Sequence, residues 1–118
     1  MLTSGDIVEV DLGVPQGSEA GMTRPAVTVT AQRILSHSPN VVQIVPLTRT
    51  IRGHATEVTV PADDHNGLAQ DSAAQCQHVR AVATSRIIGA KGNVGSLVLV
   101  TVWYGCIVMV DHLCGTGR

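Results

Sequence analysis

Hydrophobic and polar positions alternate through the first part of the chain, the pattern of strands that bury one face of a sheet. In DIVEVDL, residues 6–12, alternate positions from Val8 onward are apolar, and Glu9 and Asp11 fall between them. Similar stretches follow, separated by turns rich in Gly, Pro, Asn and Asp. The predicted strands cover residues 6–12, 26–31, 41–47, 56–61 and 73–82. A short turn is expected at 84–87.

The last long segment, LVLVTVWYGCIVMV at 97–110, is nearly all apolar and carries no charge. Its β-branched residues fit a buried strand, whereas Ser96 directly before it would suit the start of a helix. A membrane-spanning helix needs about 20 apolar residues. The segment therefore favours a core or subunit-interface element over a tail anchor. Helix and strand both stay open here, and a C-terminal helix is preferred.

Five short strands with at most one long helix predict a mainly β (α+β) fold, a small barrel, over a parallel α/β sheet. The 118 residues, with no linker and no internal repeat, suit a single domain over 1–118. Aromatic residues make up 2% of the chain, and Phe is absent. The core must therefore be aliphatic.

Charge is segregated along the chain although the net charge is -1. Residues 1–19 carry four acids and no base, while residues 20–56 carry four arginines and no acid. If these arginines gather on one face, they can hold phosphates; otherwise they are solvated charges segregated by chance. The three cysteines form no disulfide framework, and the N-terminus has no signal-peptide features, so a cytoplasmic location is predicted.

Common motifs for cofactor or metal chemistry are missing from the sequence. There is no glycine-rich phosphate loop, no HExxH and no CxxC. Cys76 with His78, and His112 with Cys114, have spacings that a zinc site or a Cys–His nucleophile could use, but nothing demands it. Buried thiols with exposed histidines are preferred, and no metal or other cofactor is predicted.

Three stretches together resemble the MazF/PemK family of toxin endoribonucleases. They are GDIVEVDLGVPQGSEAGMTRPAVTVT (5–30), VVQIVPLTRTIRG (41–53) and TEVTVPADDHNGLAQDSAAQCQHVRAV (56–82). They contain, in order, the family's Gly-Ser-Glu loop, its Arg-Pro before a strand, its Pro-x-Thr and its long hairpin. The resemblance runs from about residue 5 to residue 90, which makes it far more specific than any single motif.

The resemblance implies an SH3-like β-barrel with accessory helices, usually a homodimer, that cuts single-stranded mRNA at a short sequence without a metal ion. A cognate antitoxin protein would keep it silent. Arg24 and Thr48 match the family's catalytic Arg and Thr, and Glu19 lies beside them in the loop. The ribose 2′-hydroxyl would attack the phosphate, leaving a cyclic phosphate and a 5′-hydroxyl. Arg24 is suited to clamp the phosphate, Thr48 to hydrogen-bond it, and Glu19 to act as base.

Further polar residues near these motifs are predicted to contact RNA. They are Gln16, Ser18, Arg49, Arg52, Gln77 and Arg80. In the PemK branch an Arg and an Asp flank a Cys and exchange protons, but here Gln75 and Gln77 flank Cys76. His78 is titratable, yet on a continuous strand it would point to the opposite face from Gln77.

Simpler interpretations exist for each residue alone: a solvated Arg24, a strand-end Thr48, and a Glu19 that caps a turn. Two other functions also fit the fold that the resemblance implies. One is a noncatalytic toxin that inhibits a protein target such as gyrase. The other is an SH3-like module that binds a partner peptide.

Overall fold

The computed structural model describes residues 1–13 and 23–115, with side chains as far as Val108. The strands are β1 (Asp6–Asp11), β2 (Thr23–Thr28), β3 (Val41–Thr48), β4 (Glu57–Val60), β5 (Ser72–Gln75), β6 (Arg80–Ala83) and β7 (Ile87–Asn93). The helices are α1 (Gln32–Leu35) and α2 (Gly95–Gly115), with short 3₁₀ turns η1 (Cys76–His78) and η2 (Thr84–Arg86). The mainly β fold with a C-terminal helix is confirmed.

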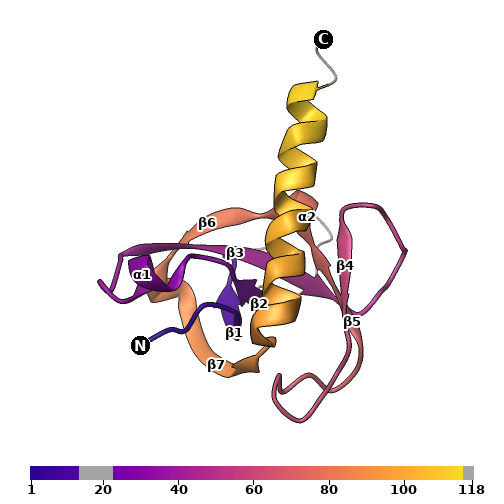
Figure 1. Cartoon of the computed structure of the whole chain (residues 1–118). Coiled ribbons are helices and arrows are strands. Elements are labelled where there is room, and N and C mark those ends of the chain that lie inside the picture. The colour runs from indigo at the N-terminus through magenta and orange to yellow at the C-terminus, as the bar shows by residue number, and fades with distance from the viewer. Residues whose placement is uncertain (14–22, 116–118) are drawn as a thin grey trace.

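All strand pairs are antiparallel, and the sheet order is β4-β5-β3-β2-β1-β7. Strand β3 is the centre of this arrangement, because its first half pairs with β6 and its end pairs with β5. The strands curl around one another, and α2 stands upright against them with its C-terminal turns extending beyond the sheet (Figure 1). The ends of β2, β3, β5 and β6 are thereby brought into one neighbourhood.

The core is aliphatic, as the lack of aromatic residues requires, and it is divided by the sheet. Ile7 belongs to a cluster that includes Val45 and Val102 of α2. Val8 and Val10 face the other way, into a second cluster that Leu35 of α1 completes. Strand β1 is thus buried on both faces along its first half, and not only on the face that alternation suggested.

The predicted strand at 73–82 is wrong as a continuous element, because η1 interrupts it between β5 and β6. The Cys76 N–H donates to the Thr56 carbonyl oxygen at 3.0 Å, and the Cys76 thiol donates to the Val102 carbonyl oxygen at 3.6 Å. The chain therefore turns at Cys76 to seat the thiol beneath α2, so residues beyond it do not follow strand alternation.

Two further elements were not predicted from the pattern. Strand β7, IIGAKGN, contains two glycines and no alternation, and it pairs with β1 through two register shifts. Helix α1 has only four residues, which is too short for a helical period to show in the sequence.

The C-terminal segment, for which helix and strand were both open, forms the helix α2. It begins at Gly95, whose φ of 84° lies in the region that favours glycine, and Asn93 Oδ1 accepts the Gly95 N–H at 2.7 Å. The start thus precedes Ser96, the residue expected there. Leu99 and Val102 face the core, while Leu97 is 83% exposed on the outer side. In the part of the chain that the structure describes, no helix is long and apolar enough to cross a membrane.

Candidate active site

A polar hollow of about 530 Å³ opens where β3 and β5 end and where β2 and β6 begin. Its described walls come from four separate stretches of the chain. The lining residues are Leu12, Arg24, Pro46, Thr48, Thr50, Arg52, Gln75, His78 and Arg80. Within residues 1–13 and 23–108 the lining has three arginines and one histidine but no carboxylate, a composition suited to a phosphate.

Arg24 and Thr48, the residues that the sequence indicated as catalytic, both line this hollow. They are brought together by strand register, because Ala26 pairs with Pro46 and Thr28 with Ile44. Continuing this antiparallel register by two residues from Ala26 places Arg24 opposite Thr48. The placement of both residues at this hollow therefore depends on the β2–β3 pairing, although 24 positions separate them in the sequence.

The Thr48 hydroxyl is oriented by the turn that follows β3. Its Oγ1 accepts the backbone N–H of Thr50 at 3.2 Å. A hydroxyl has one hydrogen to donate besides the lone pairs that accept. Thr48 can therefore donate its own hydrogen to a phosphoryl oxygen while the turn holds its oxygen in place.

Arg52 reaches the hollow from the segment between β3 and β4, and Glu57 holds that segment. Glu57 Oε1 accepts the backbone N–H groups of Arg52 at 3.1 Å and of Gly53 at 3.0 Å. Its second oxygen, Oε2, is buried and has no hydrogen-bond partner among the described residues. Glu57 thus acts on the backbone that carries Arg52, and we assign it a positioning role.

His78 lines the hollow, contrary to the prediction that alternation would turn it away. The reason is η1, since residues of a 3₁₀ turn do not alternate between two faces. Gln75, at the end of β5, lines the hollow as well. The sequence offered no signal for either placement, because nothing in AAQCQHVRAV marks the position where the strand stops.

Of the residues expected to contact RNA, Arg52 and Arg80 line the hollow, whereas Arg49 does not. Gln77 is also outside it, because its Oε1 accepts the Thr56 hydroxyl at 3.0 Å. The remaining three predicted residues, Gln16, Ser18 and Glu19, lie outside the described residues. The arginines of residues 20–56 therefore gather only in part, and Arg80 joins them from β6.

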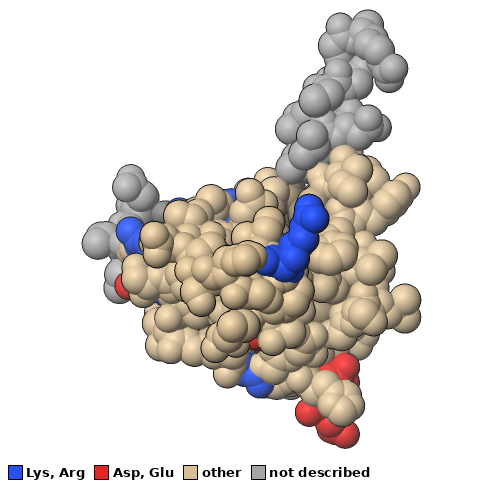
Figure 2. All heavy atoms as spheres, turned by 60° about the vertical axis from the view of Figure 1, so that its left-hand side comes forward, with Lys and Arg blue, Asp and Glu red and all other residues tan. Residues whose placement is uncertain are grey.

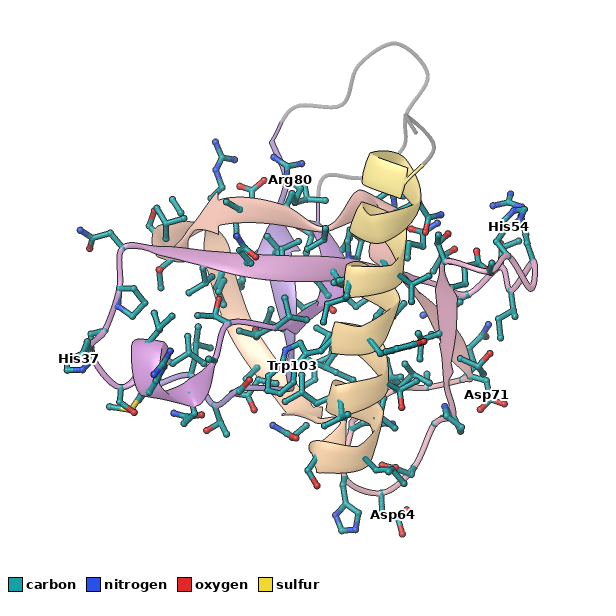
Figure 3. All side chains as sticks on the ribbon, turned by 45° about the horizontal axis from the view of Figure 1, so that its top comes forward. His37, His54, Asp64, Asp71, Arg80 and Trp103 are labelled. Carbon is teal, nitrogen blue, oxygen red and sulfur yellow. The ribbon has the colours of Figure 1, made fainter. Side chains whose placement is uncertain are left out.

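Two acidic side chains of the loop between β4 and β5 lie away from this site. Asp64 and Asp71 are in loops distant from Arg80 (Figure 3). On the face shown in Figure 2, the largest group of acidic atoms occupies one lower corner, apart from the basic side chains near the centre. Over the ranges 1–13 and 23–108, the one ion pair formed is Lys91 with Glu9. The arginines of the hollow are thus available to an anionic ligand.

The thiol nearest the site is unsuited to nucleophilic chemistry. A side-chain hydrogen bond with Cys106, together with burial, raises the pKa of Cys76 strongly. The same hydrogen bond lowers the pKa of Cys106. Because the thiolate is the reactive form, Cys76 stays inert and serves to pack η1 against α2. Within the described residues, no group of three or more His, Cys, Asp or Glu side chains could hold a metal ion.

Comparison with known proteins gives the same answer as the sequence resemblance. Residues 3–102 match the family described as PemK-like, MazF-like toxin of type II toxin-antitoxin system. The chain belongs to this family. The MazF-like chain is also 34% identical over 101 residues to Endoribonuclease MazF9 of Mycobacterium tuberculosis, covering 81% of this chain and 85% of the relative. It is 39% identical over 59 residues to Endoribonuclease MazF3 of the same species, covering 50% and 54%.

Solved structures share the fold of this MazF-like toxin. The Mycobacterium tuberculosis toxin MazF-mt6 superposes with a TM-score of 0.70 at 24% identity, covering 90% of this chain and 96% of that one. An endoribonuclease in complex with its cognate antitoxin, from a mycobacterial species, gives a TM-score of 0.74 at 16% identity, covering 94% and 96%. MazF from Deinococcus radiodurans gives 0.70 at 24% identity, covering 95% and 94%.

Proposed function

We propose that this MazF-family toxin is an endoribonuclease that cuts single-stranded mRNA, through attack of the ribose 2′-hydroxyl and without a metal ion. The observation that carries the proposal is the hollow itself. Arg24 and Thr48 meet there with Arg52 and Arg80, and none of the lining residues that the structure describes is a carboxylate. A cationic, polar hollow of this kind fits the RNA backbone and disfavours an acidic metal site.

Each side chain of the hollow has a role that follows from its chemistry. Arg24 clamps the scissile phosphate, because a guanidinium keeps its charge and offers a fork of N–H donors to the developing phosphorane. Thr48 donates a hydrogen bond to a phosphoryl oxygen. Arg52 and Arg80 hold the flanking phosphates. The products are a 2′,3′-cyclic phosphate and a 5′-hydroxyl. The base that the sequence suggested, Glu19, lies outside the described residues.

The toxin acts, in this proposal, as one domain over residues 1–118 in the cytoplasm, where its mRNA substrate lies. Its activity is held in check by a cognate antitoxin protein, and its working form is a homodimer. The antitoxin complexes among the structural neighbours support the first of these partners. The exposed outer side chains of α2, which include Leu97, Tyr104 and Ile107, favour association with a further protein surface.

The experiment is incubation of the purified protein with a long unstructured RNA in excess EDTA, followed by sequencing of the new 5′ ends. Discrete cuts at one short motif, bearing 5′-hydroxyl groups, are expected. Arg24→Ala should lower the cleavage rate by about 100-fold or more. Arg33→Ala, an exposed arginine on α1 outside the hollow, is the matched control.

Intact RNA with a correctly folded protein would refute the proposal and favour the toxin that inhibits a protein target or the peptide-binding module. Equal cleavage by Arg24→Ala and wild type would refute the role of Arg24 alone.

A further inference from the structure

Among the lining residues that the structure describes, His78 is the one histidine. Arginine keeps its proton to about pH 12 or above, and the threonine and glutamine side chains do not ionise in this range. Imidazole gains and loses its proton between about pH 5 and 8. His78 is therefore the lining residue with the chemistry of a general base.

The other described histidines lie elsewhere. His37 follows α1, and His54 lies in the segment before β4, on opposite sides of the molecule (Figure 3). His65 lies in the loop between β4 and β5, where its carbonyl oxygen accepts the Asn93 N–H at 2.9 Å. None of the three lines the hollow. The position of His78 is thus distinctive among the histidines that the structure describes.

The backbone that carries His78 is fixed on both sides, as a catalytic group requires. Cys76 is held by Thr56 through its N–H and by α2 through its thiol. The Val79 N–H donates back to the Cys76 carbonyl oxygen at 3.2 Å, which closes the 3₁₀ turn. The Gln77 side chain is tied to the Thr56 hydroxyl. His78 thus lines the hollow from a braced turn.

We infer that His78 is the general base of the cleavage reaction, an assignment that rests on the proposed function. The imidazole nitrogen takes the proton from the 2′-hydroxyl as the 2′-oxygen bonds to phosphorus. The bond from phosphorus to the 5′-oxygen breaks, and this oxygen takes a proton from water. The imidazolium then returns its proton to solvent. The RNA chain is cut, and no oxidation or reduction occurs.

The charged groups that line the hollow together with His78, among the described residues, are Arg24 of β2, Arg52 of the segment before β4, and Arg80 of β6. The uncharged Thr48 and Gln75 complete its polar surroundings. An arginine guanidinium in general keeps its proton between about pH 5 and 8. A change of rate with pH in that range therefore reports on the imidazole or on a group from outside the described residues, of which Glu19 is the one predicted at the site.

The test is single-turnover cleavage across this pH range for wild type, His78→Gln, His78→Asn, Glu19→Gln and the exposed control His37→Gln. The wild-type rate should rise with pH and then level off. Both His78 variants should lose this rise and be slower by about 10²- to 10⁴-fold at the plateau, with RNA affinity close to wild type. Glu19→Gln and His37→Gln should keep the rise.

A second substrate distinguishes a base from an acid. Replacing the scissile 5′-oxygen by sulfur gives a leaving group that departs without protonation. The defect of His78→Gln should persist on this substrate. Recovery to the wild-type rate would overturn the assignment and make His78 the general acid.

The other outcomes are equally decisive. Undiminished cleavage by His78→Gln, or loss of the pH-dependent rise in Glu19→Gln instead, would overturn this inference and leave the proposed function standing. A defect confined to RNA affinity would make His78 a binding residue only. Absence of cleavage by the wild-type protein would overturn both proposals.

Discussion

Trp103 donates its indole N–H to the backbone carbonyl oxygen of Val29 at 2.8 Å, which ties α2 to the segment that leaves β2. The side chain lies between the helix and the sheet (Figure 3). It is the one tryptophan in the chain. A buried carbonyl without its donor is costly, so this hydrogen bond holds the helix in place as well as contributing apolar contact.

Trp103→Phe should lower the free energy of unfolding by about 1–3 kcal/mol, because it removes the donor and leaves the Val29 carbonyl oxygen unpaired. Urea unfolding monitored by circular dichroism measures this change. Tyr104→Phe, one position along on the exposed side of α2, is the control and should change the free energy by less than about 0.5 kcal/mol. Equal effects of the two substitutions would contradict the role of the indole N–H.

Glu57→Ala should weaken RNA binding through Arg52, because the backbone that carries Arg52 loses its acceptor. Glu57→Gln keeps an acceptor oxygen and should bind RNA more tightly than Glu57→Ala. If Glu57 acts by positioning, Glu57→Ala combined with Arg52→Ala should bind no more weakly than Arg52→Ala alone. Fluorescence anisotropy with a noncleavable RNA measures the affinities of these variants. Additive losses would show that Glu57 acts independently of Arg52.

Gly105→Ala should lower the melting temperature, although alanine normally stabilises a helix interior by about 1 kcal/mol relative to glycine. An added Cβ would lie 2.7 Å from Cys76 Sγ and 3.3 Å from Val58 Cγ2. Removing the sulfur with Cys76→Ala relieves the closer contact. Gly105→Ala should therefore lower the melting temperature less in the Cys76→Ala background than in the wild-type protein. Thermal unfolding of the four proteins gives the comparison, and a more stable Gly105→Ala would contradict it.

Arg80→Ala should weaken RNA binding and reduce its dependence on salt. For single strands, the slope of log affinity against log salt becomes shallower by about 0.7 for each phosphate that the protein no longer neutralises. Arg33→Ala on α1 should leave the slope unchanged, because Arg33 lies outside the hollow. Titrations at several salt concentrations provide the slopes. An unchanged slope in Arg80→Ala would mean that Arg80 contacts a base or does not touch the RNA.

Much of the fold could be predicted because several strands alternate apolar and polar residues and are bounded by clear turns. The meeting of Arg24 with Thr48 was predicted by the family's motif order, and the β2–β3 register now gives its physical cause. What escaped prediction depends on contacts distant in sequence. The chain stops being a strand at Cys76 because Thr56 and Val102 hold that residue, and neither partner is visible in the local pattern.

The same limit explains His78 and β7. Alternation assigns faces only while a strand continues, so one 3₁₀ turn was enough to reverse the predicted direction of His78. Strand β7 is specified by its partner β1 and not by its own apolar period. Both are cases in which tertiary contacts outweigh local preference.

The assembly of the hollow from four separate stretches of the chain has a genetic consequence. Since no single segment holds the residues that would act on RNA, the arrangement survives only while the strands between them keep their register. A selection for cells that survive expression of this toxin should therefore recover few changes in Arg24 or Thr48 relative to those in the buried aliphatic positions of β1, β2 and β3. Mutations that inactivate the toxin are therefore expected throughout the β-barrel, and not only at the hollow.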